Sequence, residues 1–490
     1  MDRPLSQLDY IINPKSVAVI GASNSFGSWG YGVMCRLMGN SHRKVYPINR
    51  HESEIMGIKA YSSILDVPGS VDFAVISIPH VHIPNAMEDC VQKRVKGALI
   101  ISGGLAEVGE DGVKLEQQVR SIARKGGIRF IGPNSMGHID TSSGFSTLAW
   151  VRNVTKGPIG FVSQSGTYGQ RLVRYGLDVG LGFSKFISSG NEADVYLEDY
   201  LEYLGGDAET QLIIAYIEGL REGKRFFNLA KKITRNKPIV VLKTGRTAGA
   251  AKAARSHVAA MSGDDALYET MFKQCGVIRV DYDHEVADVV SALFGLPLPR
   301  GRRVGILTDG GGIGVVAADA CEGSGLELAP FSSRTIDTLN GLLPSRWPRG
   351  NPVDMAAPDK LVTFECLWAI MEDENVDSVM LIGGLGAGTF LRESMLNPGS
   401  EEGLVDDILE SMNEQEAKNI QITAEYVKKL GKPVVVSRLI PKIGMNPPVY
   451  NKLSQLGIPV YPSPEKAAKV LQHLAWYGAY LNNHTDEVCF

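Results

Sequence analysis

The chain has 490 residues, 44% of them hydrophobic, and its 50 basic and 54 acidic side chains leave a net charge of −4. This length allows two to four domains that each bury a core. The balanced charge does not indicate general binding to nucleic acid or to an anionic membrane. No apolar run approaches membrane-spanning length and the six cysteines lack metal-ligand spacing, so we expect a cytoplasmic protein with reduced thiols.

The first predicted strand, residues 16–20, runs into a glycine-rich segment at 21–32 and then a helix. This arrangement presents backbone N–H groups and the positive end of a helix to a phosphate. The glycine spacing is not GxGxxG, and the second strand ends at Arg50 rather than at an acidic ribose ligand, so a nicotinamide oxidoreductase is disfavoured. Further apolar strands with helices between them predict a doubly wound parallel sheet, at residues 44–49, 71–79, 97–103 and 129–134.

A second set of strands begins at residues 158–163 and leads into Ser-Gln-Ser-Gly, where the Ser163 and Ser165 hydroxyls and a helix start predict an anion site. An ordinary helix cap is the alternative at this position. The strand at 182–187 leads into a Ser-Ser-Gly-Asn-Glu-Ala-Asp loop, and the strand at 211–219 has Glu218 at its carboxyl end. An acidic residue at a buried strand end is costly unless paired, so a structural salt bridge is the alternative for Glu218.

One histidine stands out by its position. The apolar strand at 238–243 is followed by a segment of small residues that contains Ser256-His257-Val258. A lone histidine in such a segment is usually structural or merely exposed. However, ligands of open α/β sheets gather beyond the carboxyl ends of the strands, which makes His257 a candidate functional residue.

A proline-rich and basic linker at residues 296–303 precedes a third set of strands. The segment 304–314 starts this set, apolar runs predict further strands at 378–382, 433–437 and 458–461, and a terminal helix is predicted at 464–477. The polar stretch 401–418 interrupts this series of apolar segments, and we expect it to form an exposed loop or helix.

These motifs resemble the α subunit of NDP-forming acyl-CoA synthetases, the superfamily of ADP-forming acetyl-CoA synthetase and succinyl-CoA synthetase. The resemblance covers nearly the whole chain. The motifs that carry it are Gly-Ala-Ser, Tyr-Pro-Ile-Asn, Ser-Ile-Pro, Ser-Gly-Gly-x-Ala-Glu, Gly-Pro-Asn, Gly-Asn-x-Ala-Asp and the Ser-His segment. The resemblance implies an α/β fold with three open parallel-sheet domains. These are a Rossmann-like CoA-binding domain at 1–140, a flavodoxin-like ligase domain with the phosphohistidine at 150–296 and a second flavodoxin-like ligase domain at 302–480.

The resemblance also implies roles for individual residues. His257 is the residue that becomes phosphorylated, and Glu218 accepts a hydrogen bond from its second ring nitrogen. The implied phosphate-binding residues are Ser163, Ser165, Gly166, Gly190 and Asn191. The implied CoA-binding residues are Gly21 and Ser23 at the phosphates, Asn49 and Arg50 near the adenosine 3′-phosphate, and Ile78, Pro79, Ser102 and Gly103 along the pantetheine.

The implied reaction joins a small carboxylic acid to CoA, with conversion of a nucleoside triphosphate to the diphosphate and phosphate. His257 takes the γ-phosphoryl group and passes it to the carboxylate, and the CoA thiol attacks the resulting acyl phosphate. We find no ATP-grasp segment and no metal site in this sequence, so Mg-ATP or Mg-GTP is expected on a separate ATP-grasp β subunit of a hetero-oligomer.

Three positions depart from the commoner family pattern, namely Ser135 in place of Cys, Glu192 in place of Lys and Val258 in place of Thr. They support one alternative, a non-catalytic regulatory protein that binds CoA or acyl-CoA on the same scaffold. A protein acetyltransferase of this scaffold would need a further acyltransferase domain, for which we find no segment.

Overall fold

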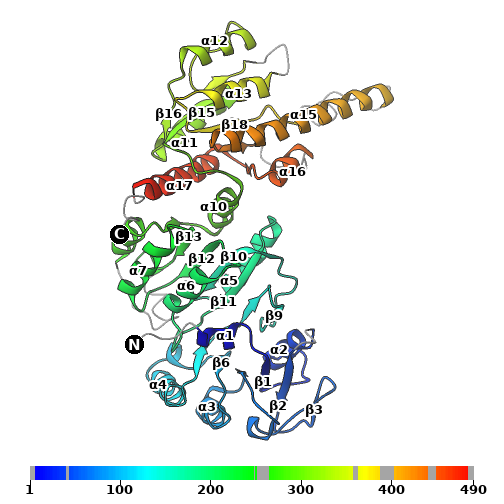
Figure 1. The fold of residues 1–490 in the computed structure, drawn as a ribbon, viewed down its shortest axis with the longest axis vertical. Helices are drawn as coiled ribbons and strands as arrows, with labels where there is room; N and C mark the ends of the chain where they lie inside the picture. The colour runs from blue at the N-terminus through cyan, green and yellow to red at the C-terminus, as the bar shows by residue number, and fades with distance from the viewer. Residues whose placement is uncertain are drawn as a thin grey trace. The chain divides into compact units, whose positions relative to one another are not determined.

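The computed structural model describes residues 6–39, 43–247, 249–250, 264–356, 362–386, 402–439 and 448–483. His257, with its neighbours Ser256 and Val258, lies outside the described residues. The chain divides into two compact units, Met1–Val286 and Ala287–Phe490, and each is described by itself. The first unit contains two large sheets and the second contains one (Figure 1).

The first sheet has five parallel strands in the order β2-β1-β5-β6-β7. Its strands are β1 (Ser16–Ile20), β2 (Lys44–Ile48), β5 (Phe73–Ile76), β6 (Gly97–Ile100) and β7 (Arg129–Ile131). The strands β1, β5, β6 and β7 are buried along their whole length, as a parallel sheet covered by helices on both faces requires. A short antiparallel pair, β3 (Glu54–Ile55) and β4 (Ile58–Lys59), follows β2.

The second sheet has the order β14-β13-β12-β10-β11-β8-β9. Its parallel strands are β10 (Lys156–Ser163), β11 (Phe183–Ser188), β12 (Leu212–Ile217), β13 (Ile239–Lys243) and β14 (Ile278–Val280). Two further strands, β8 (His138–Asp140) and β9 (Phe145–Ser146), extend the β11 edge in antiparallel fashion. The chain therefore enters the second sheet through β8 before its first parallel strand.

The third sheet lies in the second unit and follows the parallel path β16-β15-β18-β19-β20, with β17 paired to β15. Its strands are β15 (Arg303–Thr308), β16 (Glu327–Leu328), β17 (Val353–Asp354), β18 (Ser378–Ile382), β19 (Val434–Ser437) and β20 (Val460–Tyr461).

Helices occupy the connections between the strands. Those of the first unit are α1 (Ser6–Ile12), α2 (Trp29–Met38), α3 (Ile83–Gln92), α4 (Glu110–Lys125), α5 (Gly166–Asp178), α6 (Leu197–Gly206), α7 (Gly223–Ile233) and α9 (Asp265–Gln274), and α10 (Asp283–Gly295) runs across the boundary. Those of the second are α11 (Gly311–Gly323), α12 (Ser333–Leu342), α13 (Thr363–Glu372), α15 (Glu402–Leu430), α16 (Pro448–Gln455) and α17 (Pro464–Asn483). The polar stretch that was expected as a loop or helix is thus part of the 29-residue helix α15.

The five principal parallel strands of each sheet share one order, 2-1-3-4-5 in sequence, which is the flavodoxin-like arrangement. The strand order reverses between the first and third of these strands, and ligands of open α/β sheets bind beyond the carboxyl ends at that point. Ligand sites are therefore expected at the residues that follow β1 and β5, β10 and β12, and β15 and β18. The predicted α/β class with open parallel sheets is confirmed.

The first two sheets share a hydrophobic core. Helix α1 lies between them (Figure 1), with Ile11 and Ile12 buried in the same cluster as Val75 of β5 and Val162 of β10. The main-chain oxygen of Ile11 is also 2.9 Å from Nε2 of His138, which is fully buried. Burial lowers the pKa of His138 to about 4, so this ring is a neutral packing residue at neutral pH. In the described part of the chain, no helix is long and apolar enough to cross a membrane.

Candidate functional site

The strongest candidate site lies where β10 and β12 end side by side in the second sheet. Ser163 is opposite Tyr216 in the parallel register, so the segments that follow the two strands leave the sheet at the same edge. One carries Ser165 and the start of α5, and the other carries Glu218. Glu218 is therefore at the point where this topology places a ligand.

Gln164 joins these two segments. Its Oε1 accepts hydrogen bonds from the backbone N–H of Glu218 at 2.6 Å and of Gly219 at 3.1 Å, while its Nε2 donates to the Gly219 carbonyl at 2.7 Å. These three hydrogen bonds of one buried amide hold the backbone of Glu218 and Gly219. Sequence reasoning did not select Gln164, although the Ser-Gln-Ser-Gly motif contains it.

The serines of this motif shape the turn into α5. Ser165 is the N-cap of the helix, and its hydroxyl accepts a hydrogen bond from the N–H of Tyr168 at 3.4 Å. The hydroxyl of Ser163 is buried and donates to the Ser165 carbonyl at 2.6 Å. Gly166 begins the helix, where a Cβ atom would lie 2.3 Å from the Met136 side chain. The capping alternative thus applies to Ser165, and the first N–H groups of α5 are the feature suited to an anion.

Lys243 ends the neighbouring strand β13 and binds the same segment from the other side. Its Nζ donates to the Glu218 carbonyl at 3.0 Å and to the Thr244 carbonyl, and it lies 4.6 Å from the centre of the Tyr268 ring. Lys243 is only 2% exposed, and burial lowers its pKa to about 8. The segment that leads toward His257 therefore starts beside Glu218.

The loop after β11 carries Gly190, Asn191 and Glu192. Gly190 has φ +65°, and a Cβ there would lie 2.2 Å from the Pro133 carbonyl oxygen, so glycine is required for this close approach. The side chain of Asn191 is buried and donates hydrogen bonds to Glu107 and Glu116 of the first domain. The Asn191 side chain is thus oriented toward the first domain.

Glu192 is 1% exposed, and its Oε1 accepts a hydrogen bond from the Ser189 hydroxyl at 2.7 Å. Burial, followed by the neighbouring Glu198 carboxyl, raises the pKa of Glu192 to about 8. Glu192 is therefore mainly neutral at pH 7. It faces a cavity of about 170 Å³ between α4 and the loop after β11, lined also by Glu116, Arg120 and Arg221.

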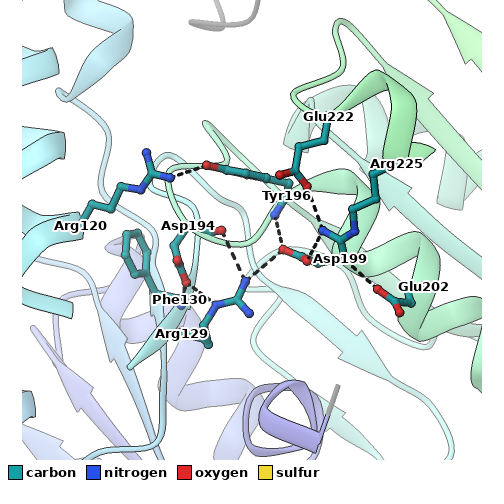
Figure 2. A network of polar contacts seen from close by, with 9 residues as sticks. All are labelled: Arg120, Arg129, Phe130, Asp194, Tyr196, Asp199, Glu202, Glu222 and Arg225. Carbon is teal, nitrogen blue, oxygen red and sulfur yellow. Dashed lines mark hydrogen bonds and ion pairs between the residues drawn. The ribbon is translucent and has the colours of Figure 1, made fainter. Parts of the chain in front are cut away.

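An ion-pair network ties the first domain to the second beside this loop, and we call it the junction network (Figure 2). Its members are Arg120, Arg129, Asp194, Tyr196, Asp199, Glu202, Glu222 and Arg225. Arg129 of β7 pairs with Asp194 at 2.7 Å and with Asp199 at 3.0 Å, and Arg225 of α7 reaches Asp199 at 2.8 Å. Both aspartates are almost fully buried, so their charges depend on these arginines.

In the first sheet, the corresponding strand ends are those of β1 and β5. Gly21 has φ +93°, and a Cβ there would lie 2.2 Å from the Ser77 oxygen, which forces glycine where β1 turns toward α2. The Ser23 hydroxyl accepts a hydrogen bond from the N–H of Ser25 at 2.9 Å. Asn49 donates to the Ala22 carbonyl at 2.8 Å and thereby holds the same turn, while Arg50 is exposed beside it.

The remaining predicted CoA-binding residues lie along the next strand ends. The Ser102 hydroxyl donates to the Ile78 carbonyl at 2.6 Å, which brings the segments after β5 and β6 together, while Pro79 is exposed and Gly103 is partly exposed. Ser135 is buried, donates to the Ser188 carbonyl at 2.6 Å and accepts from the N–H of Gly137. Its hydroxyl thus connects the two domains.

The third sheet has a similar strand end within its own unit. Thr308 ends β15 and accepts from the N–H of Gly310, and α11 begins at the next residue. Asp309 accepts from the N–H of Gly384 after β18, and burial raises the pKa of this carboxyl. Sequence reasoning gave these residues no role, although Thr-Asp-Gly-Gly-Gly-Ile-Gly has the strand, glycine turn and helix pattern that selected the other two sites.

Comparison with known proteins agrees with this architecture. Residues 15–140 match the model of a CoA binding domain, and residues 156–293 match that of a succinyl-CoA ligase like flavodoxin domain. Two curated relatives are α subunits of ADP-forming acetate–CoA ligases from Pyrococcus furiosus. The type II subunit is 37% identical over 94% of this chain and 96% of its own length, and the type I subunit is 35% identical over 98% and 100%.

A solved structure from Candidatus Korarchaeum cryptofilum, a dinucleotide forming acetyl-coenzyme A synthetase 1 in complex with phosphate and ADP, has a TM-score of 0.81. It is 29% identical and covers 99% of both chains. The acetate–CoA ligase of Methanocaldococcus jannaschii is 40% identical over 71% of this chain but only 49% of its own length, so much of that protein has no counterpart in this chain. With its CoA-binding domain, its flavodoxin-like ligase domain and these full-length relatives, the chain belongs to the family of ADP-forming acyl-CoA ligase α subunits.

Proposed function

We propose that the chain carries the phosphohistidine and acyl-transfer steps of an ADP-forming acyl-CoA ligase, with His257 as the phosphoryl carrier and Glu218 as its partner. The observation that carries this proposal is the pairing of β12 with β13. Ile217 lies opposite Lys243, and Lys243 donates to the Glu218 carbonyl at 3.0 Å. The segment that contains His257 thus departs from the strand next to Glu218.

The chemistry follows from the properties of an imidazole beside a carboxylate. A carboxylate that accepts a hydrogen bond from one ring nitrogen fixes the tautomer and leaves the lone pair of the other nitrogen available. That nitrogen attacks the γ-phosphorus of ATP, forming a P–N bond as the P–O bond to ADP breaks. The carboxylate oxygen of the acid then attacks the same phosphorus, which breaks the P–N bond and yields an acyl phosphate.

Positive groups near the carrier would stabilise the transferred phosphoryl group. The N-terminal N–H groups of α5 supply partial positive charge at the strand end beside Glu218. Gln164 and Lys243 bind no phosphate in this proposal. They hold the Glu218 backbone in place, which reduces the reorganisation needed at the moment of transfer.

The first domain fits the binding of CoA. A Cβ at Gly30 would lie 1.9 Å from the Gly21 oxygen, so the turn between β1 and α2 is tight, and the loop at 24–27 within it is exposed. We propose that Gly21, Ser23, Asn49 and Arg50 hold the nucleotide end. When bound, CoA supplies the thiol that receives the acyl group, with its pantetheine along Ile78, Pro79, Ser102 and Gly103.

We propose a separate ATP-grasp subunit as the partner. The Pyrococcus relatives are named as subunits, and the longer Methanocaldococcus relative carries additional sequence in the same chain. Because these relatives are named ADP-forming, we propose Mg-ATP as the nucleotide, a small carboxylic acid as the substrate and a cytoplasmic hetero-oligomer as the working form. A regulatory CoA-binding protein is disfavoured, since the curated relatives are named as ligases.

The test is mass spectrometry at neutral to basic pH of the chain with its co-purified partner and Mg-ATP. We expect an acid-labile phosphate on the peptide that contains His257, absent in His257→Asn. His284→Asn is the matched control, because His284 is a partly exposed histidine that stacks on Tyr282 at the start of α10. If the wild-type protein remains unphosphorylated with a competent partner, His257 is not the phosphoryl carrier, and the alternative of a regulatory CoA-binding protein is favoured.

A further inference from the structure

The loop after β11 and the end of the CoA-binding domain are joined through their backbones. The N–H of Gly132 donates to the Ser189 carbonyl at 3.2 Å, the N–H of Asn191 to the Pro133 carbonyl at 2.9 Å, and the N–H of Ala193 to the Gly132 carbonyl at 3.0 Å. These hydrogen bonds hold the backbone of Asn191 against the end of the first domain. Its side chain then points to a carboxylate there.

That carboxylate belongs to Glu107, in the short 3-10 helix Ala106–Val108 that follows β6. Its Oε1 accepts from the N–H of Gly104 at 2.5 Å, and its Oε2 accepts from the N–H of Leu105 at 3.2 Å and from Nδ2 of Asn191 at 2.5 Å. Burial opposes ionisation, but the hydrogen bonds from Asn191 and from backbone amides hold the pKa of Glu107 below its usual value. Glu107 is thus a charged residue bonded on both sides of the domain junction.

The loop held by Glu107 is the one predicted to line the pantetheine path. Gly104 has φ +93°, and a Cβ at Gly103 would lie 2.9 Å from Oε1 of Glu107 and 3.2 Å from Oδ1 of Asn134. The loop after β6 therefore packs directly against the carboxylate and the Gly-Pro-Asn turn. A ligand that shifts Gly103 or Gly104 must also move Glu107.

On the other side, Asn191 contacts the segment that carries Glu218. The carbonyl of Asn191 accepts from Nη2 of Arg221 at 2.8 Å, and Arg221 is three residues after Glu218. A continuous path of hydrogen bonds and backbone therefore runs from Gly104 through Glu107, Asn191 and Arg221 to Glu218. Glu107 need not touch a substrate for this path to act, and the Asn191 side chain takes part in it through its hydrogen bonds to Glu107 and Glu116.

We propose that Glu107 is a positioning residue that couples CoA binding on the first domain to the state of the phosphohistidine site on the second. This inference rests on the proposed function. Coupling of this kind is reciprocal, so phosphorylation of His257 changes the affinity for CoA by the same factor by which CoA shifts the phosphorylation equilibrium. The affinity change is therefore a direct readout of the path.

Glu116 of α4 provides a matched control. Its Oε2 also accepts from Nδ2 of Asn191, at the longer distance of 3.1 Å, and from the N–H of Ala106 at 3.3 Å. Burial raises the pKa of Glu116, in contrast to that of Glu107. Glu116 thus joins Asn191 to Ala106 but does not bind the Gly104 and Leu105 amides, so its replacement leaves the contact of Glu107 with the loop at Gly103 and Gly104 in place.

The experiment compares Glu107→Gln with Glu116→Gln in the complex with the partner subunit. The dissociation constant of CoA is measured by calorimetry before and after phosphorylation with Mg-ATP, and phosphorylation is verified by mass spectrometry. In wild type we expect phosphorylation to change the CoA dissociation constant about tenfold, within the usual range of coupling between sites. Glu107→Gln should bring this ratio close to one, while Glu116→Gln should keep it.

Asn191→Ser removes the side-chain hydrogen bond from Asn191 to Glu107 on the ligase side of the same path. This variant replaces Glu107→Gln in the experiment if Glu107→Gln fails to fold. A ratio of one in wild type, or an unchanged ratio in Glu107→Gln or Asn191→Ser, overturns the inference and leaves the proposed function standing. Wild-type protein that cannot be phosphorylated overturns both. A uniform loss of CoA affinity with the ratio preserved also overturns it, because a merely structural role predicts that result.

Discussion

Two polar clusters at the junction of the first two domains differ in how they balance charge. In the junction network of Figure 2, the buried carboxylates of Asp194 and Asp199 each pair with an arginine. In the neighbouring cluster around Asn191, by contrast, the Glu107 and Glu116 carboxyls share one neutral amide. In the first arrangement each buried carboxylate has an arginine partner, whereas in the second the surroundings lower the pKa of Glu107 and raise that of Glu116.

Substitution of Arg129 should have the largest effect on this comparison. Arg129→Met leaves Asp194 and Asp199 buried with too few cations, and loss of one partner from a buried ion pair costs about 3–5 kcal/mol. We expect a large drop in the denaturant midpoint of the first unit. Lys114→Met, at an exposed ion pair on α4, is the control and should change little. An Arg129→Met midpoint equal to that of wild type would contradict the structural role of the network.

Glu192, which follows Asn191 in the loop after β11, extends the comparison to a third buried carboxyl that can be tested through pH. The folded protein raises the pKa of Glu192 from 4.5 to about 8, so between these values the folded state binds more protons than the unfolded state. Stability contributed by this residue therefore falls as pH rises from about 4.5 to about 8, with a limiting slope of about 1.4 kcal/mol per pH unit for one proton. Glu192→Gln should remove that slope.

The measurement is the free energy of unfolding at several values between pH 5.5 and 7.5, for wild type and Glu192→Gln. The difference in stability between the two proteins should move in favour of the variant as the pH increases. Parallel pH profiles would show that Glu192 is already ionised in the folded protein, contrary to the burial argument.

Tyr196 should give the smallest effect. Its hydroxyl accepts from Nη2 of Arg120 at 2.5 Å at the edge of the junction network (Figure 2). Tyr196→Phe removes this hydrogen bond but keeps the ring, so we expect a loss of about 1 kcal/mol or less in the free energy of unfolding. A loss as large as that of Arg129→Met would mean that the edge of the network matters as much as its buried centre.

Much of the fold could be predicted from the sequence because buried parallel strands leave a local signal. The apolar runs ending at Ile20, Ser163 and Lys243 each mark a strand of the structure, and the residues after them mark the carboxyl edges of the sheets. The same signal placed Glu218 at the carboxyl end of the strand that is β12 in the structure. Helix α1 was not predicted, because its burial depends on contacts with both sheets.

The partners of the candidate residues could not be predicted, because they come from distant parts of the chain. Gln164 binds the backbone of Glu218 and Gly219, and Glu107 meets Asn191 across 84 positions. Such pairs depend on how two sheets meet, which no local pattern encodes. Asn49 was selected as a CoA-binding residue, and its side chain also has a structural role at the turn after β1.

The central claim is that Glu218 prepares His257 for phosphoryl transfer. The most direct measurement is the rate at which phosphate appears on His257 after rapid mixing of the complex with Mg-ATP, compared between wild type and Glu218→Gln. We predict a rate at least about 100-fold lower in the variant, within the usual contribution of acid–base and orienting groups, with unchanged ATP affinity. An equal rate in the two proteins would contradict the account, because the carboxylate at the end of β12 would then be dispensable for the histidine.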